Sequence, residues 1–177
     1  MGQLICPFFV LAFCQIHRLF VGDVMKINIK KLVISILLPL FVGFLASFLI
    51  KEQLDLYDVL LKPAFAPFKA VFPIVWSILY LLMGVSFYFI WNDEKKNMDA
   101  IVAYGLQLVF NFFWPILFFN ARLLFISFVW ILLLVIVIVD MIFIFYKENK
   151  LSAILLVPYL AWCVFACYLN GAIYLLN

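Results

Sequence analysis

The chain has 177 residues, of which 70% are hydrophobic, 20% are aromatic and 12% are charged. Soluble domains carry about 25% charged residues, and a chain of this length has too few core positions to bury so much apolar surface. The composition therefore excludes a water-soluble globule, a disordered tail and a disulfide scaffold. The net charge of +3 is small and scattered, which does not indicate a nucleic-acid partner.

Residues 1–24 differ from the rest of the chain. Their apolar part, Leu4–Ile16, has 13 residues, which is too short to cross a bilayer. Its basic residues follow it, which is the wrong order for a signal peptide. Met25 then opens the basic segment MKINIKK ahead of a long apolar run. We therefore expect translation to begin at Met25, with residues 1–24 a mis-assigned start or a disordered extension of a membrane domain over residues 25–177.

Five long apolar stretches follow, and each is long enough to cross about 30 Å of hydrocarbon. They cover residues 32–50, 70–92, 100–121, 123–146 and 151–176, and only the fourth contains a charged residue before its end, Asp140. Continuous apolar runs favour helices over the alternating pattern of membrane barrel strands. The sequence therefore predicts an all-α membrane protein, a five-transmembrane-helix bundle.

The connection between the first two spans is longer than the others. Residues 51–69 form a charged loop that contains Pro63 and Pro67, whereas the other connections are short. Long loops beside otherwise tight turns are often functional, so this segment is a candidate lid over one end of the bundle.

The distribution of Lys and Arg predicts the orientation of the bundle in the membrane, because cytoplasmic loops carry an excess of both. Eight lie on the side of the amino terminus and four on the side of the candidate lid. The amino terminus is therefore expected inside, and the candidate lid and the carboxyl terminus outside. The larger group comprises Arg18, Lys26, Lys30, Lys31, Lys95, Lys96, Lys147 and Lys150, and the smaller group Lys51, Lys62, Lys69 and Arg122.

Aromatic residues and prolines occur at unusual positions within the spans. Trp76 and Tyr80 are four residues apart, as are Trp114 and Phe118, so each pair lies on one helix face and can form one wall of a pocket. Ordinary helix packing or lipid contact is the alternative for each side chain. Four spans also contain a proline, which removes an amide donor and bends the helix. These are Pro39, Pro73, Pro115 and Pro158.

Three polar side chains, Gln107, Asn111 and Asp140, lie well inside the spans. Such groups usually face the bundle interior, because exposure to lipid is costly. Asn111 is expected to join helices by hydrogen bonds or to contact a ligand. Asp140 lies seven residues before Lys147, so it either faces the interior or reaches the inner headgroup region. The only histidine, His17, precedes the spans, and we predict no metal site.

Small residues form two seams along the predicted helices. Gly43 and Ser47 are four residues apart in the first span, and Cys163, Cys167 and Gly171 repeat at the same spacing in the fifth. Small side chains at this spacing let helices approach closely. The seams are compatible with packing inside the bundle and with a dimer face.

Three ordered segments resemble one family. YDVLLKPAFAPFKAVFPIVWSILYLLMG (Tyr57–Gly84) resembles the loop and second helix of the TspO/MBR family, the tryptophan-rich sensory proteins and mitochondrial translocator proteins. NFFWPILFFNAR (Asn111–Arg122) resembles its third helix, and PYLAWCVFACYLN (Pro158–Asn170) its fifth. With the five-span count, the resemblance covers residues 25–177.

The resemblance implies a five-helix bundle, often a homodimer, with a pocket beneath the first loop. Family members bind porphyrins such as protoporphyrin IX and other flat apolar ligands, and no cofactor is required. A membrane receptor or sensor for porphyrins is the function that follows. The motif match places Tyr57, Trp76, Asn111, Trp114, Trp162 and Ala166 at the pocket, and the helix-face pairs add Tyr80 and Phe118 to the predicted ligand-binding residues.

Two other functions stay open. Some family members promote light-dependent porphyrin breakdown, in which tryptophans matching Trp76 and Trp162 are implicated, so a light- and oxygen-dependent porphyrin-degrading enzyme is the first alternative. Transport of tetrapyrroles is the second, although the sequence contains no inverted repeat and no chain of ionisable residues through the spans. No general base or metal ligand is evident in the motifs, which favours binding over catalysis.

The chain departs from the family pattern at a few positions. In the loop, Leu56 replaces a usual tryptophan and Phe68 a usual proline. No Lys or Arg follows Tyr174, so the carboxyl-terminal cholesterol-recognition pattern of animal members is absent, which argues against sterol binding. The composition, rich in Ile, Phe and Lys and without a transit peptide, favours a bacterial plasma membrane.

Mass spectrometry of the native protein tests the start site. We expect the amino-terminal peptide to begin at Met25, because the basic segment that follows it directly precedes the first span. Peptides from residues 1–24 would contradict this expectation.

Overall fold

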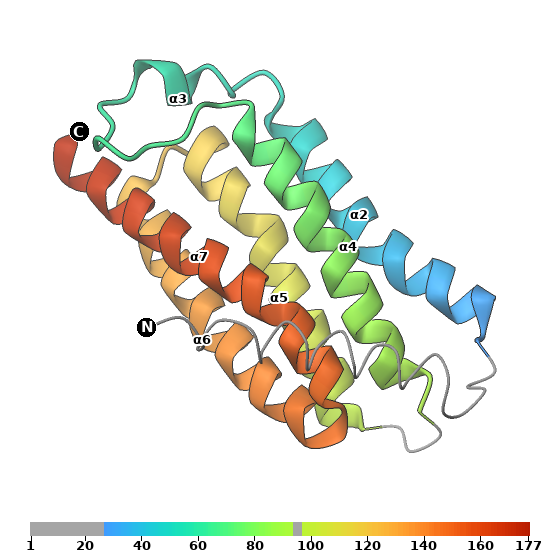
Figure 1. Cartoon of the computed structure of the whole chain (residues 1–177). Coiled ribbons are helices and arrows are strands. Elements are labelled where there is room, and N and C mark those ends of the chain that lie inside the picture. Colours follow the sequence, from blue (N-terminus) through green and yellow to red (C-terminus); the bar gives the residue numbers. More distant parts are fainter. Residues whose placement is uncertain (1–26, 94–96) are drawn as a thin grey trace, which may run out of the picture.

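The computed structural model describes residues 27–93 and 97–177, and the expectation for residues 1–24 lies outside the described residues. Within those two ranges there is no strand, and five helices are long and apolar enough to cross a membrane (Figure 1). The predicted all-α class and five spanning helices are thereby confirmed. The helices are α2 (Ile29–Ile50), α4 (Val71–Trp91), α5 (Met98–Pro115), α6 (Leu124–Glu148) and α7 (Lys150–Leu176), and α5 continues as a π-helix, η1 (Ile116–Asn120).

Three helices begin one to three residues before the predicted apolar spans, because asparagines cap their first turns. The side-chain oxygen of Asn28 accepts a hydrogen bond from a first-turn amide at 3.1 Å, that of Asn97 at 2.9 Å and that of Asn149 at 3.1 Å. A side chain that satisfies a free amide lets the helix start among polar residues. The apolar run alone marks only the part of each helix that lies in hydrocarbon.

The order of the helices around the bundle differs from their order along the chain. α4 packs against α2 on one side and against α7 on the other, while α6 packs against α5 and α7, and α5 also contacts α2 (Figure 1). The ring is therefore α2, α4, α7, α6, α5. This arrangement gives α4 one face toward α2 and α5 and another toward α7.

Side chains fill the half of the bundle that contains the end of α4 and the start of α5. Phe87 stacks on Tyr104 with ring centroids 4.0 Å apart, and Phe145 is buried beside Tyr104. In the same half, the hydroxyl of Ser86 donates to the carbonyl of Ser152 at 2.8 Å, and the hydroxyl of Ser152 donates to the carbonyl of Ser86 at 2.5 Å. Both serines are buried, so these bonds tie α4 to α7 directly.

Residues 51–70 join α2 to α4 across the opposite end of the bundle, and we call them the lid loop (Figure 1). The loop contains a one-turn helix, α3 (Leu56–Val59), which the sequence analysis did not predict. The side chain of Asn177 holds the loop to the end of α7. Its nitrogen donates to the carbonyl of Leu61 at 3.1 Å, and its oxygen accepts from the amide of Leu61 at 3.0 Å.

Both small-residue seams contribute to packing within the bundle. A Cβ atom on Gly43 would lie 2.1 Å from the ring of Tyr80, and one on Gly171 would lie 3.0 Å from the ring of Phe128. The backbones of α4 and α2 approach closely at Gly84 of α4, where a Cβ would lie 2.6 Å from Cα of Ile36 in α2. Backbone atoms cannot move aside as a flexible side chain does, so α2 and α4 meet only because residue 84 has no side chain.

Gly84→Ala tests this contact. We expect it to lower the free energy of unfolding by about 1 to 3 kcal/mol, because the added methyl group forces α2 and α4 apart. Thermal unfolding in detergent micelles measures the loss. The matched control is Gly105→Ala in α5, where no atom lies within 4 Å of the added Cβ. Equal losses in the two variants would contradict the close approach.

Candidate functional site

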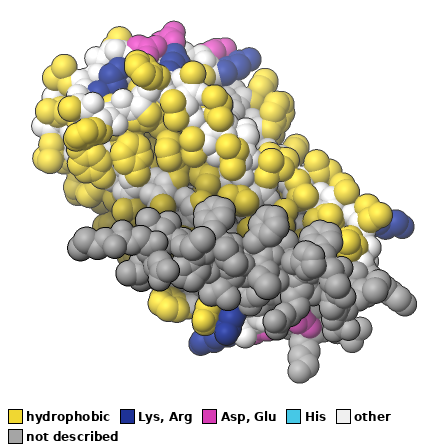
Figure 2. Space-filling view, viewed as in Figure 1, with side chains coloured by type: hydrophobic (Ala, Val, Ile, Leu, Met, Phe, Trp, Pro, Cys, Tyr) yellow, Lys and Arg dark blue, Asp and Glu magenta, His cyan; other side chains and the backbone are white. Residues whose placement is uncertain are grey.

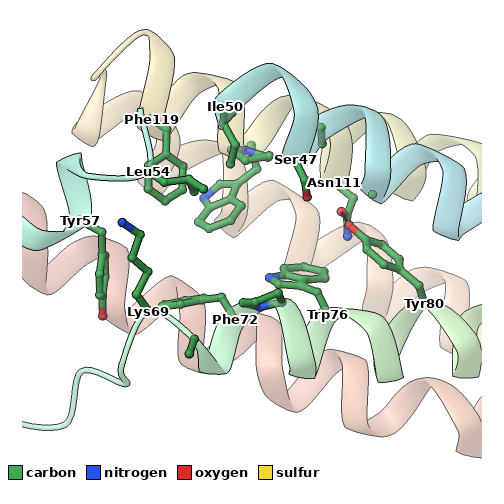
Figure 3. A pocket seen from close by; sticks show the side chains of 16 residues that line it. Ser47, Ile50, Leu54, Tyr57, Lys69, Phe72, Trp76, Tyr80, Asn111 and Phe119 are labelled. Atoms are coloured by element: carbon green, nitrogen blue, oxygen red, sulfur yellow. Dashed lines mark hydrogen bonds between the residues drawn. The ribbon is translucent and has the colours of Figure 1, made fainter. Parts of the chain in front are cut away.

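A cavity of about 510 Å³ lies beneath the lid loop, between α2, α4 and α5 (Figure 3). Each of these elements supplies part of its lining. The residues are Gly43, Ala46, Ser47 and Ile50 of α2; Leu54, Tyr57, Lys69 and Ala70 of the lid loop; Phe72, Pro73, Trp76 and Tyr80 of α4; and Asn111, Trp114, Pro115 and Phe119 of α5 and η1.

The local sequence explains why space is left at this end of the bundle. On α2 the lining includes Gly43 and Ala46, whose small side chains leave room opposite the aromatic residues of α4. On α5, Pro115 has no amide hydrogen, and the chain continues from it as the wider turn of η1, in which the amide of Ala121 donates to the carbonyl of Ile116 at 3.0 Å. Small residues and a proline therefore prevent the close packing seen in the other half.

Stacked aromatic rings form the wall of the cavity. Trp76 stacks on Tyr80 with ring centroids 5.5 Å apart, and Trp114 lies 6.4 Å from Trp76 with an interplanar angle of 33°. The indole nitrogen of Trp114 is buried and has no hydrogen-bond partner among the described residues. Neighbouring aromatic rings with an unpaired donor suit a flat apolar ligand that carries an acceptor.

Buried hydrogen bonds connect the cavity floor to the other helices. The hydroxyl of Tyr80 donates to the side-chain oxygen of Asn111 at 2.8 Å, and the Asn111 nitrogen donates to the hydroxyl of Tyr159 at 3.0 Å. The Tyr159 hydroxyl in turn donates to the side-chain oxygen of Gln107 at 2.9 Å. Asn111 and Gln107 thus face the interior, whereas Asp140 is exposed on α6. The network joins α4, α5 and α7 and leaves Asn111 in contact with the cavity.

Charged groups and one tyrosine hold the lid loop over the mouth. The ammonium group of Lys69 lies 2.8 Å from Asp55 and 3.1 Å from Asp58, and the hydroxyl of Tyr57 donates to the carbonyl of Pro67 at 2.9 Å. Lys62 donates to the carbonyl of Tyr57 at 2.8 Å and lies 4.7 Å from the centroid of its ring. These contacts fold the loop back on itself above the cavity.

The ion pair shifts the pKa values of its members in opposite directions. The hydrogen bond and charge of Lys69 lower the pKa of Asp55, and the hydrogen bonds to Asp55 and Asp58 raise the pKa of Lys69. Burial, with the nearby charge of Asp58, raises the pKa of Tyr57. The stability that ionised Asp55 contributes to the folded lid loop is fully present above the ordinary carboxyl pKa. It is lost as the pH falls through the lowered pKa of Asp55. The ion pair is therefore formed at neutral pH, and salt weakens it because Asp55 is exposed.

The structure places five of the eight predicted residues at the cavity: Tyr57, Trp76, Tyr80, Asn111 and Trp114. The other three do not line it. Phe118 is buried with its ring 6.0 Å from that of Trp114, Trp162 packs edge to face on Phe72 at 6.0 Å, and Ala166 is buried in the core.

The wall formed by α2 was not among the predicted site residues. Its only sequence signal is the spacing of Gly43 and Ser47, which indicates close packing and does not distinguish a cavity wall from a helix contact.

Asn111→Leu tests the buried network. The substitution leaves the hydroxyl of Tyr80 without its acceptor in an apolar interior, so we expect the free energy of unfolding to fall by about 1 to 3 kcal/mol. Thermal unfolding in micelles measures the change. Asn120→Leu is the control, because the exposed Asn120 side chain makes one bond, to the carbonyl of Leu49 at 3.1 Å. A loss in the control as large as in Asn111→Leu would contradict a special role for the network.

Comparisons with known proteins agree with this architecture. A profile of the TspO/MBR family matches residues 35–176, which include the whole of α4, α5 and α6. The tryptophan-rich protein TspO of Archaeoglobus fulgidus is 40% identical over 152 residues, which cover 85% of this chain and 99% of the relative. The translocator protein of Homo sapiens is 36% identical over 138 residues, covering 76% of this chain and 80% of the relative. The chain is an integral membrane protein and belongs to the TspO/MBR family.

Proposed function

We propose that the protein is a membrane receptor or sensor that binds porphyrins, such as protoporphyrin IX, and other flat apolar ligands in the cavity beneath the lid loop. The observation that carries the proposal is the row of Trp76, Tyr80 and Trp114 along a mostly apolar cavity. A planar ring system buries one face against such a wall, and each aromatic contact adds about 0.5 to 1.5 kcal/mol beyond burial. The unpaired indole donor and Asn111 supply the few polar groups that orient a ligand.

Lys69 is the cation best placed to meet the carboxylates of a porphyrin. It lines the cavity and already binds two carboxylates, those of Asp55 and Asp58. A ligand carboxylate can exchange with either of them without leaving the ammonium group unpaired. Lys62 is engaged with the carbonyl and ring of Tyr57, so its contribution is to hold the lid loop.

Titration with protoporphyrin IX, followed by quenching of tryptophan fluorescence, tests the proposal on the purified full chain. Lys69→Gln and Asp55→Asn form a matched pair, because both remove the ion pair between residues 69 and 55 but only the first removes the cation. We expect Lys69→Gln to raise the Kd several-fold, Asp55→Asn to leave it unchanged or lower it, and neither to change the Kd of the uncharged porphyrin dimethyl ester.

The titrations test the receptor function and the role of Lys69 separately. Absence of saturable binding to the unsubstituted chain would reject the receptor function, whereas equal effects of the two variants would reject only the role of Lys69. Illumination of the bound complex in air distinguishes a receptor from a degrading enzyme. We expect the porphyrin to be recovered unchanged, because Trp162, one of the two tryptophans that the family resemblance implicates in breakdown, packs on Phe72 and does not line the cavity.

The proposed location is a bacterial plasma membrane, with the lid loop on the outer face. The count of Lys and Arg supports this orientation, and charged side chains are seen at the two ends of the bundle with hydrophobic ones between them (Figure 2). A ligand that arrives from outside would then meet the lid loop first.

A further inference from the structure

A second hollow lies on the other face of α4, where α4 and α7 are neighbours (Figure 1). It is an open groove of about 510 Å³ on the outside of the bundle. Every described residue that lines it is apolar. Leu79 is buried at its base, Ile78 and Ala161 are exposed beside it, and Trp162 and Phe165 form a continuous aromatic side, with ring centroids 5.6 Å apart.

The groove lies on the outer side of α4 and α7, between two levels at which contacts join these helices, whereas on the inner side Trp76 of α4 contacts Tyr159 of α7. Farther from the lid loop, the hydrogen bonds between Ser86 and Ser152 hold the two helices together. Nearer the lid loop, Phe72 of α4 contacts Trp162 of α7. Between these levels α7 presents Pro158 and the small Ala161, which do not fill the space opposite α4.

The position of the groove identifies the kind of molecule that fills it. On α4 its lining runs from Val75 to Leu82, which begins about 6 Å from the lid-side end of the helix and extends for about 10 Å. This part of a spanning helix lies in the hydrocarbon of the lid-side leaflet, where water is absent. A void there forfeits dispersion contacts with its lining unless hydrocarbon enters it.

We propose that the groove is a binding site for one acyl chain of a membrane phospholipid from the lid-side leaflet. A chain at the base of the groove contacts Leu79 below it, α4 on one side and the rings of Trp162 and Phe165 on the other. It is therefore held on three sides, unlike a lipid that touches the convex surface of a single helix. The site shares no lining residue with the cavity, and the two hollows are linked by the contact of Phe72, which lines the cavity, with Trp162, which lines the groove.

Quenching by brominated lipid tests the proposal on the full chain in bilayers. Bromine on an acyl chain quenches an indole that it touches, so mixtures of dioleoylphosphatidylcholine and its dibrominated analogue report the contact. The emission of Trp162 is obtained as the difference between the unsubstituted chain and Trp162→Phe. We expect this emission to fall in proportion to the brominated fraction, as it does when a single chain occupies a discrete site.

A substitution that fills the groove is compared with one that adds the same side chain outside it. Ala161→Phe places a ring where the acyl chain would lie, and we expect most of the quenching of Trp162 to be lost. Val164→Phe adds a ring to an exposed position of α7 that does not line the groove, and we expect the quenching to persist. If Trp162→Phe does not fold, the same two variants are compared by their total tryptophan emission.

Three results would overturn the proposal. Equal quenching in Ala161→Phe and Val164→Phe would show contact with lipid outside the groove. A steep, curved dependence on the brominated fraction would show many exchanging lipids and no discrete site. Absence of quenching would show that something other than lipid, such as a second copy of the chain, covers the groove. None of these outcomes depends on porphyrin binding in the cavity.

Discussion

A polar group inside a bilayer has no water to bond with, so a hydrogen bond to another part of the protein stabilises it strongly. In this bundle such bonds determine how the helices are joined. Asn111 accepts from Tyr80 and donates to Tyr159, which links α4, α5 and α7 through one side chain. The indole of Trp130 similarly donates to the carbonyl of Phe110 at 2.8 Å and links α6 to α5. The positions of the aromatic rings around the cavity depend on these bonds.

The two ends of the bundle are packed differently because their helices carry side chains of different size. Where Gly84 permits contact with Ile36 and the serines pair, the helices are in close contact and the interior is full. Toward the lid loop, the small residues of α2 do not fill the space opposite α4, α5 continues past Pro115 as the wider turn of η1, and the cavity remains. The lid loop above it is held by hydrogen bonds from Asn177 and Tyr57 and by exposed ion pairs that water and salt weaken.

α4 serves as a partition between two apolar hollows. Trp76 and Tyr80 face the cavity, whereas Ile78 and Leu82 face the groove between α4 and α7. Residues on different faces of one helix therefore line different hollows. Phe72 belongs to the cavity and touches Trp162, which belongs to the groove, so this pair is the point at which the two hollows meet.

The sequence by itself determined the five spans, because charge and hydropathy are local properties and a helix satisfies its own backbone in lipid. Spacing along a helix also placed Trp76 with Tyr80 and Trp114 with Phe118, and the family motifs pointed to Tyr57 and Asn111. Only the tertiary structure decided that Gly43 and Ala46 form a wall of the cavity and that Trp162 turns away from it to the groove. Helical periodicity specifies which residues share a face, but the partner of that face depends on the order of the helices around the bundle, which contacts distant in sequence establish.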